Sequence, residues 1–222
     1  MLSKLKTKSQ TQTYFFPNWV DEKFIDSSNF KQHKFLASNK FKVLYSGNIG
    51  EKQDWDFFLN IAKQFKGNKN IEFIIVGDGA SKKELKDATM HLQNVIHYNP
   101  IPYNDLNDLL CSADLHILFQ KENVIDTVMP SKILGMMASA NPSIVTGNPK
   151  SEVAKVFDIS KGGSFYNPTN FDGVEKAIQH YYENKMLCVS TGINARNYIV
   201  SHFSKENVLE NFNEKLKSLI KL

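Results

Sequence analysis

The sequence contains few cysteines and no long apolar run. Its two cysteines, Cys111 and Cys188, lie far apart beside apolar neighbours, which is typical of buried reduced thiols rather than of a disulfide framework. The longest apolar runs, such as FIIVG and LHILF, fall well short of the roughly 20 residues that span a bilayer, and no apolar signal region follows the lysine-rich start. We therefore expect a soluble, unexported, cytoplasmic protein.

Arginine is almost absent as well, because Arg196 is the only one in the chain. Proteins often grip phosphate groups with the bidentate fork of arginine. Any phosphate site here must instead use lysines, hydroxyls and backbone amides. The formal net charge is only +4 and the lysines are spread along the chain. This distribution argues against a nucleic-acid partner, which would favour a basic patch or stripe.

What the sequence does contain is an alternation of short apolar runs with helical patterns. Trp55, Phe58, Leu59, Ala62 and Phe65 recur at the spacing of one buried helix stripe. Strands that are apolar on both faces and alternate with helices indicate a parallel sheet covered on both sides. We predict an α/β, Rossmann-like fold of about six strands, with helices on both faces and extra C-terminal helices. The expected strands are 43–46, 71–76, 95–98, 115–119, 143–146 and 164–166.

The chain divides into three expected segments. Residues 1–39 are interpreted as an N-terminal tail and interdomain linker, because they are polar and lysine-rich apart from the segment YFFPNWVD. Residues 40–185 hold the predicted sheet, and residues 186–222 form C-terminal helices. Asn170 and Ser204 are expected helix N-caps. The last helix presents an apolar stripe of Val208, Phe212, Leu216, Leu219 and Ile220.

Ligands of an open parallel sheet bind outside the carboxyl ends of its strands, which directs attention to the loops that follow them. In SGNIGEK, after the first strand, Gly47 and Gly50 allow close backbone approach and Lys52 supplies positive charge. The same pattern fits an ordinary glycine turn before a helix. Gly77 fits either a pocket floor or a turn after the second strand. The loop of Ile101, between two prolines, fits either a platform for a flat base or a rigid connection.

The most informative loop follows the fourth expected strand and leads into PSKILGMMASA. Ser131 is the expected N-cap of that helix. Free amides at the helix start, the positive end of the helix dipole, the Ser131 hydroxyl and Lys132 would together suit a diphosphate. Glu122 and Asp126, earlier in the loop, either bind sugar or ribose hydroxyls or are surface charges. A plain helix start beside a solvated lysine is the competing interpretation.

Motifs of several other chemistries are missing from the sequence. It has no G-x-x-x-x-G-K-[ST], no G-x-G-x-x-G after the first strand, no G-x-S-x-G and no clustered Cys/His spacing for zinc. His116 lies within the expected strand ADLHILF and is interpreted as a core histidine rather than a base. The other histidines have no carboxylate or nucleophile at a suggestive spacing. Catalytic residues therefore stay unassigned.

The ordered set of segments resembles the GT-B glycosyltransferases of retaining family 4, especially bacterial enzymes of capsular, colanic-acid-like and O-antigen polysaccharide synthesis. The resemblance covers about 17–182. It is carried by FPNWVD, YSGNIGEKQ, IIVGDG, the Ile101 loop, SADLHIL, and VMPSKILGMMASANPSIVTG followed by SEVA. It implies that this chain is the nucleotide-sugar-binding half of such an enzyme and that a separate N-terminal half holds the acceptor.

The resemblance also implies roles for particular residues. The segment from Gly47 to Gly50 would lie against the diphosphate, Lys52 would offset its charge, and Ser131 would hold its other side. The family's E-x7-E signature would place carboxylates at Thr127 and Gly135, and a PSK-type subgroup that this chain also resembles lacks the second carboxylate. The full expected donor-binding set is Gly47, Asn48, Gly50, Lys52, Gly77, Ile101, Asp126, Thr127, Ser131, Lys132 and Glu152.

The reaction implied by the resemblance is transfer of a sugar, with retention, from a nucleoside diphosphate sugar to a lipid-linked saccharide acceptor. No metal or other cofactor is needed, since amides and lysine would stabilise the leaving diphosphate. The isolated chain would be inactive without its N-terminal half, and the full-length protein would associate peripherally with the inner face of the membrane. Two alternatives remain open. One is a GT-B-fold nucleotide-sugar epimerase, and the other is a non-catalytic nucleotide-sugar-binding or scaffold module.

Overall fold

The computed structural model describes residues 13–124 and 129–220, and its centre is a six-stranded, all-parallel sheet. The strand order is β3-β2-β1-β4-β5-β6. Each of the six predicted apolar runs lies within one of these strands, which confirms the predicted fold class. The strands are β1 Phe41–Asn48, β2 Ile71–Asp78, β3 Val95–Tyr98, β4 Leu115–Phe119, β5 Ser143–Thr146 and β6 Gly163–Tyr166.

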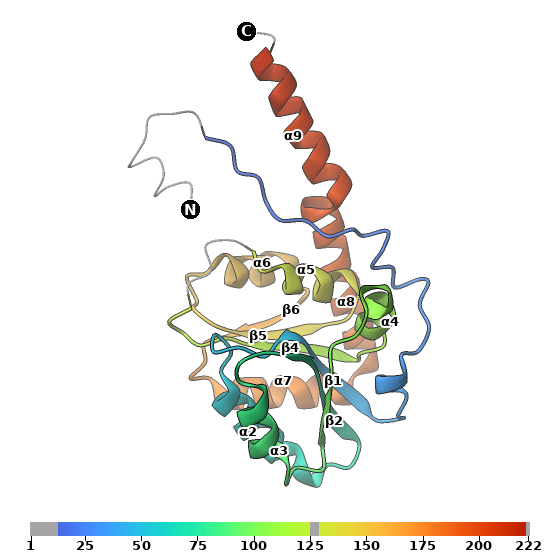
Figure 1. Cartoon of the computed structure of the whole chain (residues 1–222), viewed down its shortest axis with the longest axis vertical. Helices are drawn as coiled ribbons and strands as arrows, with labels where there is room; N and C mark the ends of the chain where they lie inside the picture. Colours follow the sequence, from blue (N-terminus) through green and yellow to red (C-terminus); the bar gives the residue numbers. More distant parts are fainter. Residues whose placement is uncertain (1–12, 125–128, 221–222) are drawn as a thin grey trace.

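Helices cover both faces of the sheet. Figure 1 shows α5 and α6 on one face and α2, α3 and α7 on the other. All residues of β4 and β5 are buried between these layers, as expected for strands that are apolar on both faces. The α-helices are α2 Trp55–Gln64, α3 Lys82–Thr89, α4 Leu106–Cys111, α5 Ser131–Ala138, α6 Glu152–Ser160, α7 Phe171–Glu183, α8 Lys185–Phe203 and α9 Lys205–Ile220. Short 3-10 turns occupy Lys34–Leu36, Phe65–Gly67 and Tyr103–Asp105.

Side-chain caps fix where several helices begin. Asn170 accepts a hydrogen bond from the Gly173 amide at 3.0 Å, and Ser204 accepts one from the Asn207 amide at 3.3 Å. Both predicted caps are confirmed. Each cap satisfies an amide that has no partner within its own helix, which typically contributes about 1 kcal/mol to stability.

The only arginine holds the N-terminal segment to the rest of the fold. Among the described residues before β1, Val20 and Ile25 are buried in the core. Nη1 of Arg196 donates to the carbonyl oxygens of Ile25 at 2.7 Å and Ala138 at 2.5 Å, and Nη2 donates to that of Glu22 at 3.1 Å. The guanidinium thereby joins the segment before the sheet to α8 and to the end of α5.

The same segment also pairs with the junction of α8 and α9. The amide of Val20 donates to the carbonyl of Phe203 at 3.0 Å, and the amide of Lys205 donates to the carbonyl of Val20 at 2.9 Å. Lys205 forms an ion pair with Asp21 at 3.0 Å, and Lys23 forms one with Glu206 at 3.2 Å. Hydrogen bonds and ion pairs therefore hold the segment before the sheet against the start of the last helix.

The last helix extends away from the packed body (Figure 1). Val208, in its first turn, is buried, and Phe16 packs against Phe212 with ring centroids 4.6 Å apart. Further along, Leu216 is 42% exposed and Leu219 is 46% exposed. The predicted apolar stripe thus exists, but its outer half is not covered by the described part of the chain. None of the described helices is long and apolar enough to cross a membrane.

His116 belongs to the core, as the sequence predicted. It lies in β4, fully buried, with Nε2 2.9 Å from the Oγ of Ser139. Burial lowers the pKa of its imidazole to about 4, because a charged ring would lose its hydration. The ring is therefore neutral in the folded protein at neutral pH.

We expect His116 to make the fold acid-sensitive. Below pH 6.5 the unfolded chain binds a proton at this ring, whereas the folded chain does so only near pH 4. Between these values the free energy of unfolding should fall by up to about 1.4 kcal/mol per pH unit from this residue alone. Urea unfolding across this range should show a shallower decline for His116→Gln than for the wild type. The exposed His180→Gln is the control, and equal slopes for wild type and His116→Gln would contradict the assignment.

Candidate functional site

The strand order reverses between β1 and β4, which makes their carboxyl ends the expected ligand site of this sheet. The loops that follow the two strands are joined there. The amide of Lys121 donates to the carbonyl of Lys52 at 3.1 Å, and the amide of Asp54 donates to that of Phe119 at 2.8 Å. One continuous edge of backbone therefore borders the switch point.

Two glycines let β1 and β2 approach closely at this edge. Gly47 has a φ of +133°, which disfavours any side chain, and it pairs in register with Gly77. A Cβ added at Gly77 would lie 1.9 Å from the Gly47 carbonyl oxygen. Gly77 is therefore buried in β2 against Gly47, and the absence of a side chain at Gly47 leaves bare backbone at the carboxyl end of β1.

Lys132 extends from the start of α5 over this bare backbone. A Cβ added at Gly47 would be 3.1 Å from its Nζ. The same Nζ donates to the hydroxyl of Tyr45 at 2.9 Å and lies 4.6 Å from the centroid of the Tyr45 ring. Tyr45 in turn donates to the carbonyl of Asn48 at 2.5 Å. The position of the ammonium is thus fixed by β1, 87 residues away in the sequence.

The Lys132 side chain is partly buried, and its ammonium forms no ion pair with any described residue. Burial lowers the pKa of Lys132 to about 8, and burial also raises that of Tyr45 above its ordinary value. Tyr45 therefore stays protonated and keeps donating. A partly buried ammonium that no described carboxylate compensates gains free energy when an anion binds beside it.

The structure corrects the expected role of Ser131. Pro130 occupies the N-cap position with extended backbone (φ −63°, ψ 131°), and no side chain caps this helix. Ser131 is instead the first helical residue and is exposed. The ring of proline already imposes the φ that this position requires, so that serine moves one place into the helix. The hydroxyl remains available, but the capping function assigned to it was wrong.

The loop after β1 holds the next group of predicted residues. A Cβ added at Gly79 would be 2.5 Å from Oδ1 of Asn48, and one added at Gly50 would be 3.0 Å from its Nδ2. The Asn48 side chain therefore lies between these two glycines. Lys52 is exposed in the following turn. The structure thus brings Gly47, Asn48, Gly50, Gly77 and Lys132 to one edge, with Lys52 at its margin.

Other predicted residues lie further from this group. Ile101 follows β3, at the edge of the sheet, and its side chain packs partly buried against the core. Glu152 begins α6 after the cap Ser151, and its carboxylate pairs with Lys155 at 2.9 Å. Its ion-pair partner is therefore within its own helix. Asp126 and Thr127 lie outside the described residues.

Two observations concern the carboxylates expected near the site. A Cβ at Gly135 would be 3.2 Å from Cδ1 of Leu110, so that a glutamate there would require Leu110 to move. Glu122 is bound into the loops, because its carboxylate accepts from Asn167 at 3.3 Å and its carbonyl accepts from Asn148 at 3.1 Å. Glu122 therefore ties together the segments that follow β4, β5 and β6.

Sequence reasoning missed Tyr45. The sequence places it only within a predicted buried strand, yet its hydroxyl accepts from Lys132 and donates to the carbonyl of Asn48 in the following loop. The available signal was its place two residues before Gly47, since residues i and i+2 of a strand share a face. In this chain the Tyr45 hydroxyl reaches the carboxyl edge, where it donates to the carbonyl of Asn48.

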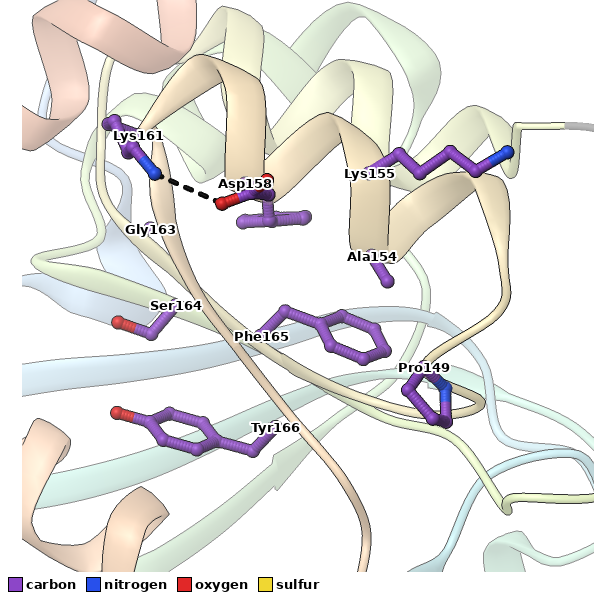
Figure 2. A pocket seen from close by; sticks show the side chains of 10 residues that line it. Pro149, Ala154, Lys155, Asp158, Lys161, Gly163, Ser164, Phe165 and Tyr166 are labelled. Atoms are coloured by element: carbon purple, nitrogen blue, oxygen red, sulfur yellow. Dashed lines mark hydrogen bonds and ion pairs between the residues drawn. The ribbon is translucent and has the colours of Figure 1, made fainter.

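A separate hollow of about 560 Å³ lies beside the edge strand β6 and below α6, as Figure 2 shows. Phe165 and Tyr166 line it together with two lysines. Lys161 pairs with Asp158 at 3.1 Å, and Lys155 pairs with Glu152. Both lysines are therefore already compensated, which makes this hollow a weaker candidate for an anion than the edge beneath Lys132.

Comparison with known proteins agrees with this geometry. A family model described as glycosyl transferases group 1 matches residues 40–184. The putative colanic acid biosynthesis glycosyl transferase WcaI of Escherichia coli is 29% identical over 207 residues, and the match covers 89% of this chain and 50% of that protein. The chain therefore spans half the length of this curated relative.

Solved structures share the fold at low sequence identity. TarM of S. aureus, in a complex that contains UDP, has a TM-score of 0.75 at 17% identity, covering 96% of this chain and 41% of TarM. HepE of Anabaena, in complex with UDP-glucose, has a TM-score of 0.73 at 15% identity, and the match covers 90% of this chain and 56% of HepE. Sucrose-phosphate synthase of Thermosynechococcus elongatus has a TM-score of 0.76 at 13% identity, and the match covers 99% of this chain and 56% of the synthase.

Partly burying an ammonium that no described carboxylate compensates should cost stability, and Lys132→Met should recover it. We expect the free energy of unfolding to rise by about 1 to 3 kcal/mol at neutral pH, because the thioether fills similar volume without losing hydration. Tyr45 keeps its bond to Asn48 in this variant. Chemical denaturation measures the change, and a Lys132→Met protein less stable than the wild type would contradict the account.

The lowered pKa of Lys132 should also make the stability of the fold depend on pH above pH 8. Above pH 8 the folded chain releases the proton of Lys132, whereas the unfolded chain holds it up to about pH 10.5. The unfolded state then binds more protons, so that stability gains a rising contribution across this window. Lys132→Met should lack that contribution, and the exposed control Lys176→Met should retain it. Identical alkaline profiles for wild type and Lys132→Met would show that this lysine is not buried in solution.

Proposed function

The chain belongs to the glycosyl transferases group 1 family, and from that premise we propose that it is the donor-binding half of a glycosyltransferase. The donor is a nucleoside diphosphate sugar. Its diphosphate lies at the carboxyl edge over Gly47 and beside Lys132. The one observation that carries this assignment is the partly buried ammonium of Lys132, which pairs with no described carboxylate and lies above bare backbone at the switch point of the sheet.

The chemistry of the site fits a leaving diphosphate. Negative charge on the diphosphate grows as the bond to the sugar breaks, and groups already fixed toward it stabilise the transition state. Lys132 is fixed by Tyr45, and the free amides at the start of α5 add the positive end of a helix dipole. Removing one such donor typically costs about 3 kcal/mol of transition-state stabilisation. The reaction needs no resident metal, because lysine and amides offset the charge.

Two relatives support the choice of donor. The TarM structure contains UDP and the HepE structure contains UDP-glucose. The present chain would bind its donor through the diphosphate, which UDP and all nucleoside diphosphate sugars share. The sugar is transferred, with retention, to a saccharide acceptor that is lipid-linked, in the synthesis of a surface polysaccharide. Gly50, Lys52, Ile101, Glu152, Asp126, Thr127 and Ser131 remain proposed contacts of the donor.

A second, N-terminal half completes the enzyme in this proposal. The matches cover between 41% and 56% of the solved structures named above. The outer face of α9, with Leu216 and Leu219, is exposed in the described chain and is available to such a partner. The partner would hold the acceptor, and the assembled enzyme would work at the inner face of the membrane.

A non-catalytic nucleotide-sugar-binding module is the second candidate. It is favoured by Gly135, which places no carboxylate at the second position of the E-x7-E signature and where a Cβ would lie 3.2 Å from the Leu110 side chain. The two candidates share donor binding and differ in turnover. Adding an N-terminal half and an acceptor should produce saccharide transfer if the chain is part of an enzyme, and only binding if it is a module.

The isolated chain should bind UDP or GDP weakly, because the site offers an anion pocket that nothing closes. Lys132→Met should weaken this binding at least tenfold, or by about 1.4 kcal/mol. Lys176→Met, an exposed lysine on α7, should leave it unchanged. Isothermal titration of both variants measures the difference. If neither nucleotide produces heat with the wild type, or if Lys132→Met binds as tightly, the proposed diphosphate site is wrong.

The two halves of α9 should contribute differently to the free energy of unfolding. Removing residues 213–222 should change the free energy of unfolding by less than about 0.5 kcal/mol, because Leu216 and Leu219 contact solvent rather than the core. By contrast, Val208→Ala should cost about 1 to 2 kcal/mol, since Val208 is buried. Thermal unfolding checks both. A large loss on truncation would mean that the outer half of α9 packs on this chain.

A further inference from the structure

A second hollow lies on the opposite face from α5 and α6, between α2 and α3. Its volume is about 210 Å³, and it is bordered by the loop after β1 and by Lys121 after β4. Leu59, Leu85 and Ala88 contribute apolar surface beside the Trp55 ring, and the remaining lining is polar. The proposed diphosphate site uses none of its side chains, although both adjoin the same loop.

One wall of this hollow is an indole held in place on several sides. Nε1 of Trp55 donates to the carbonyl of Gly50 at 3.0 Å. The ring meets those of Tyr45 and Phe58 edge to face, with centroids 4.9 Å and 6.0 Å apart. Trp55 is partly exposed and lines the hollow. A fixed aromatic surface of this kind suits the C–H face of a pyranose ring, which is apolar although its rim carries hydroxyls.

A buried amide provides a second, independent feature. Gln53 lines the hollow and is only 7% exposed. Its Oε1 accepts from the Gly50 amide at 3.2 Å, whereas its Nε2 donates to none of the described residues. Nε2 is not one of the buried, unpartnered side-chain atoms of the described residues, so it reaches the solvent and can donate to water or to a ligand in the hollow.

The charges around the hollow exclude the ligand of the other site. Glu51, Asp56 and Glu84 line it, against the single cation of Lys121. These carboxylates form no ion pair within the described chain. Such an excess of acceptors repels a diphosphate, and it suits a ligand with many hydroxyl donors.

We propose that the hollow between α2 and α3 is a second binding site, which holds one pyranose unit of a glycan. Trp55 stacks on the ring, Asp56 and Glu84 accept from its hydroxyls, and Gln53 donates to a ring substituent. The inference rests on the proposed function only for the choice of saccharide as ligand. The site is separate from the diphosphate site, and each can be removed without the other.

Tryptophan fluorescence tests the proposal directly, because the chain has only two tryptophans. Trp19→Phe leaves Trp55 as the sole reporter. The probes are glucose, galactose, mannose, fucose and N-acetylglucosamine, with saturation-transfer NMR on the same sugars as a second readout. We expect saturable, millimolar binding of at least one probe. Asp56→Asn with Glu84→Gln should weaken it about fivefold or more, because charge-assisted hydrogen bonds are lost.

Matched variants separate this site from the other. Asp172→Asn, which changes the same type of first-turn residue on α7, should leave the saccharide response intact. Lys132→Met should also leave it intact while UDP binding falls, whereas Asp56→Asn with Glu84→Gln should leave UDP binding intact. No saccharide signal by either readout, or an unchanged signal in the double variant, overturns the proposal. So does a response to methylguanidinium without any response to sugars, which would identify a cation site.

Discussion

The contact between Gly47 and Gly77 is the constraint on which the rest of the site depends. The carbonyl of Gly47 occupies the space where a side chain at position 77 would begin. Because Gly47 also lacks a side chain, its backbone is partly exposed, and the space above it is left for the ammonium of Lys132. Any larger residue at either position would move the loop after β1, and with it the side chain of Asn48.

Lys132 illustrates a conflict between stability and function. Its burial beside Tyr45 lowers its pKa and must oppose folding, since no described carboxylate compensates it. Such strain commonly persists where a ligand relieves it. The surrounding sheet supplies the stability that tolerates this cost, because its central strands are buried on both faces. The opposite charge pattern of the hollow between α2 and α3 shows that one sheet presents two chemically distinct surfaces.

The sheet could be predicted from the sequence because strand and helix periodicity are local properties. The site could be predicted only in part. The N-cap was misplaced by one residue, because Pro130 and Ser131 are both compatible with a helix start. The pairing of Lys132 with Tyr45 joins residues 87 apart, and no local pattern contains it. The carbonyls that Arg196 contacts likewise come from two distant segments, 22–25 and the end of α5, which only the fold brings together.

The bonds between Val20 and the junction of α8 and α9 have a mechanical consequence. Residues 13–19 and the outer part of α9 both leave the packed body from this one fastened corner. A second body attached through both segments would have its two connections side by side. It would therefore swing about a single pivot, with little freedom to slide, and the angle of that swing would decide how closely it approaches the carboxyl edge of the sheet.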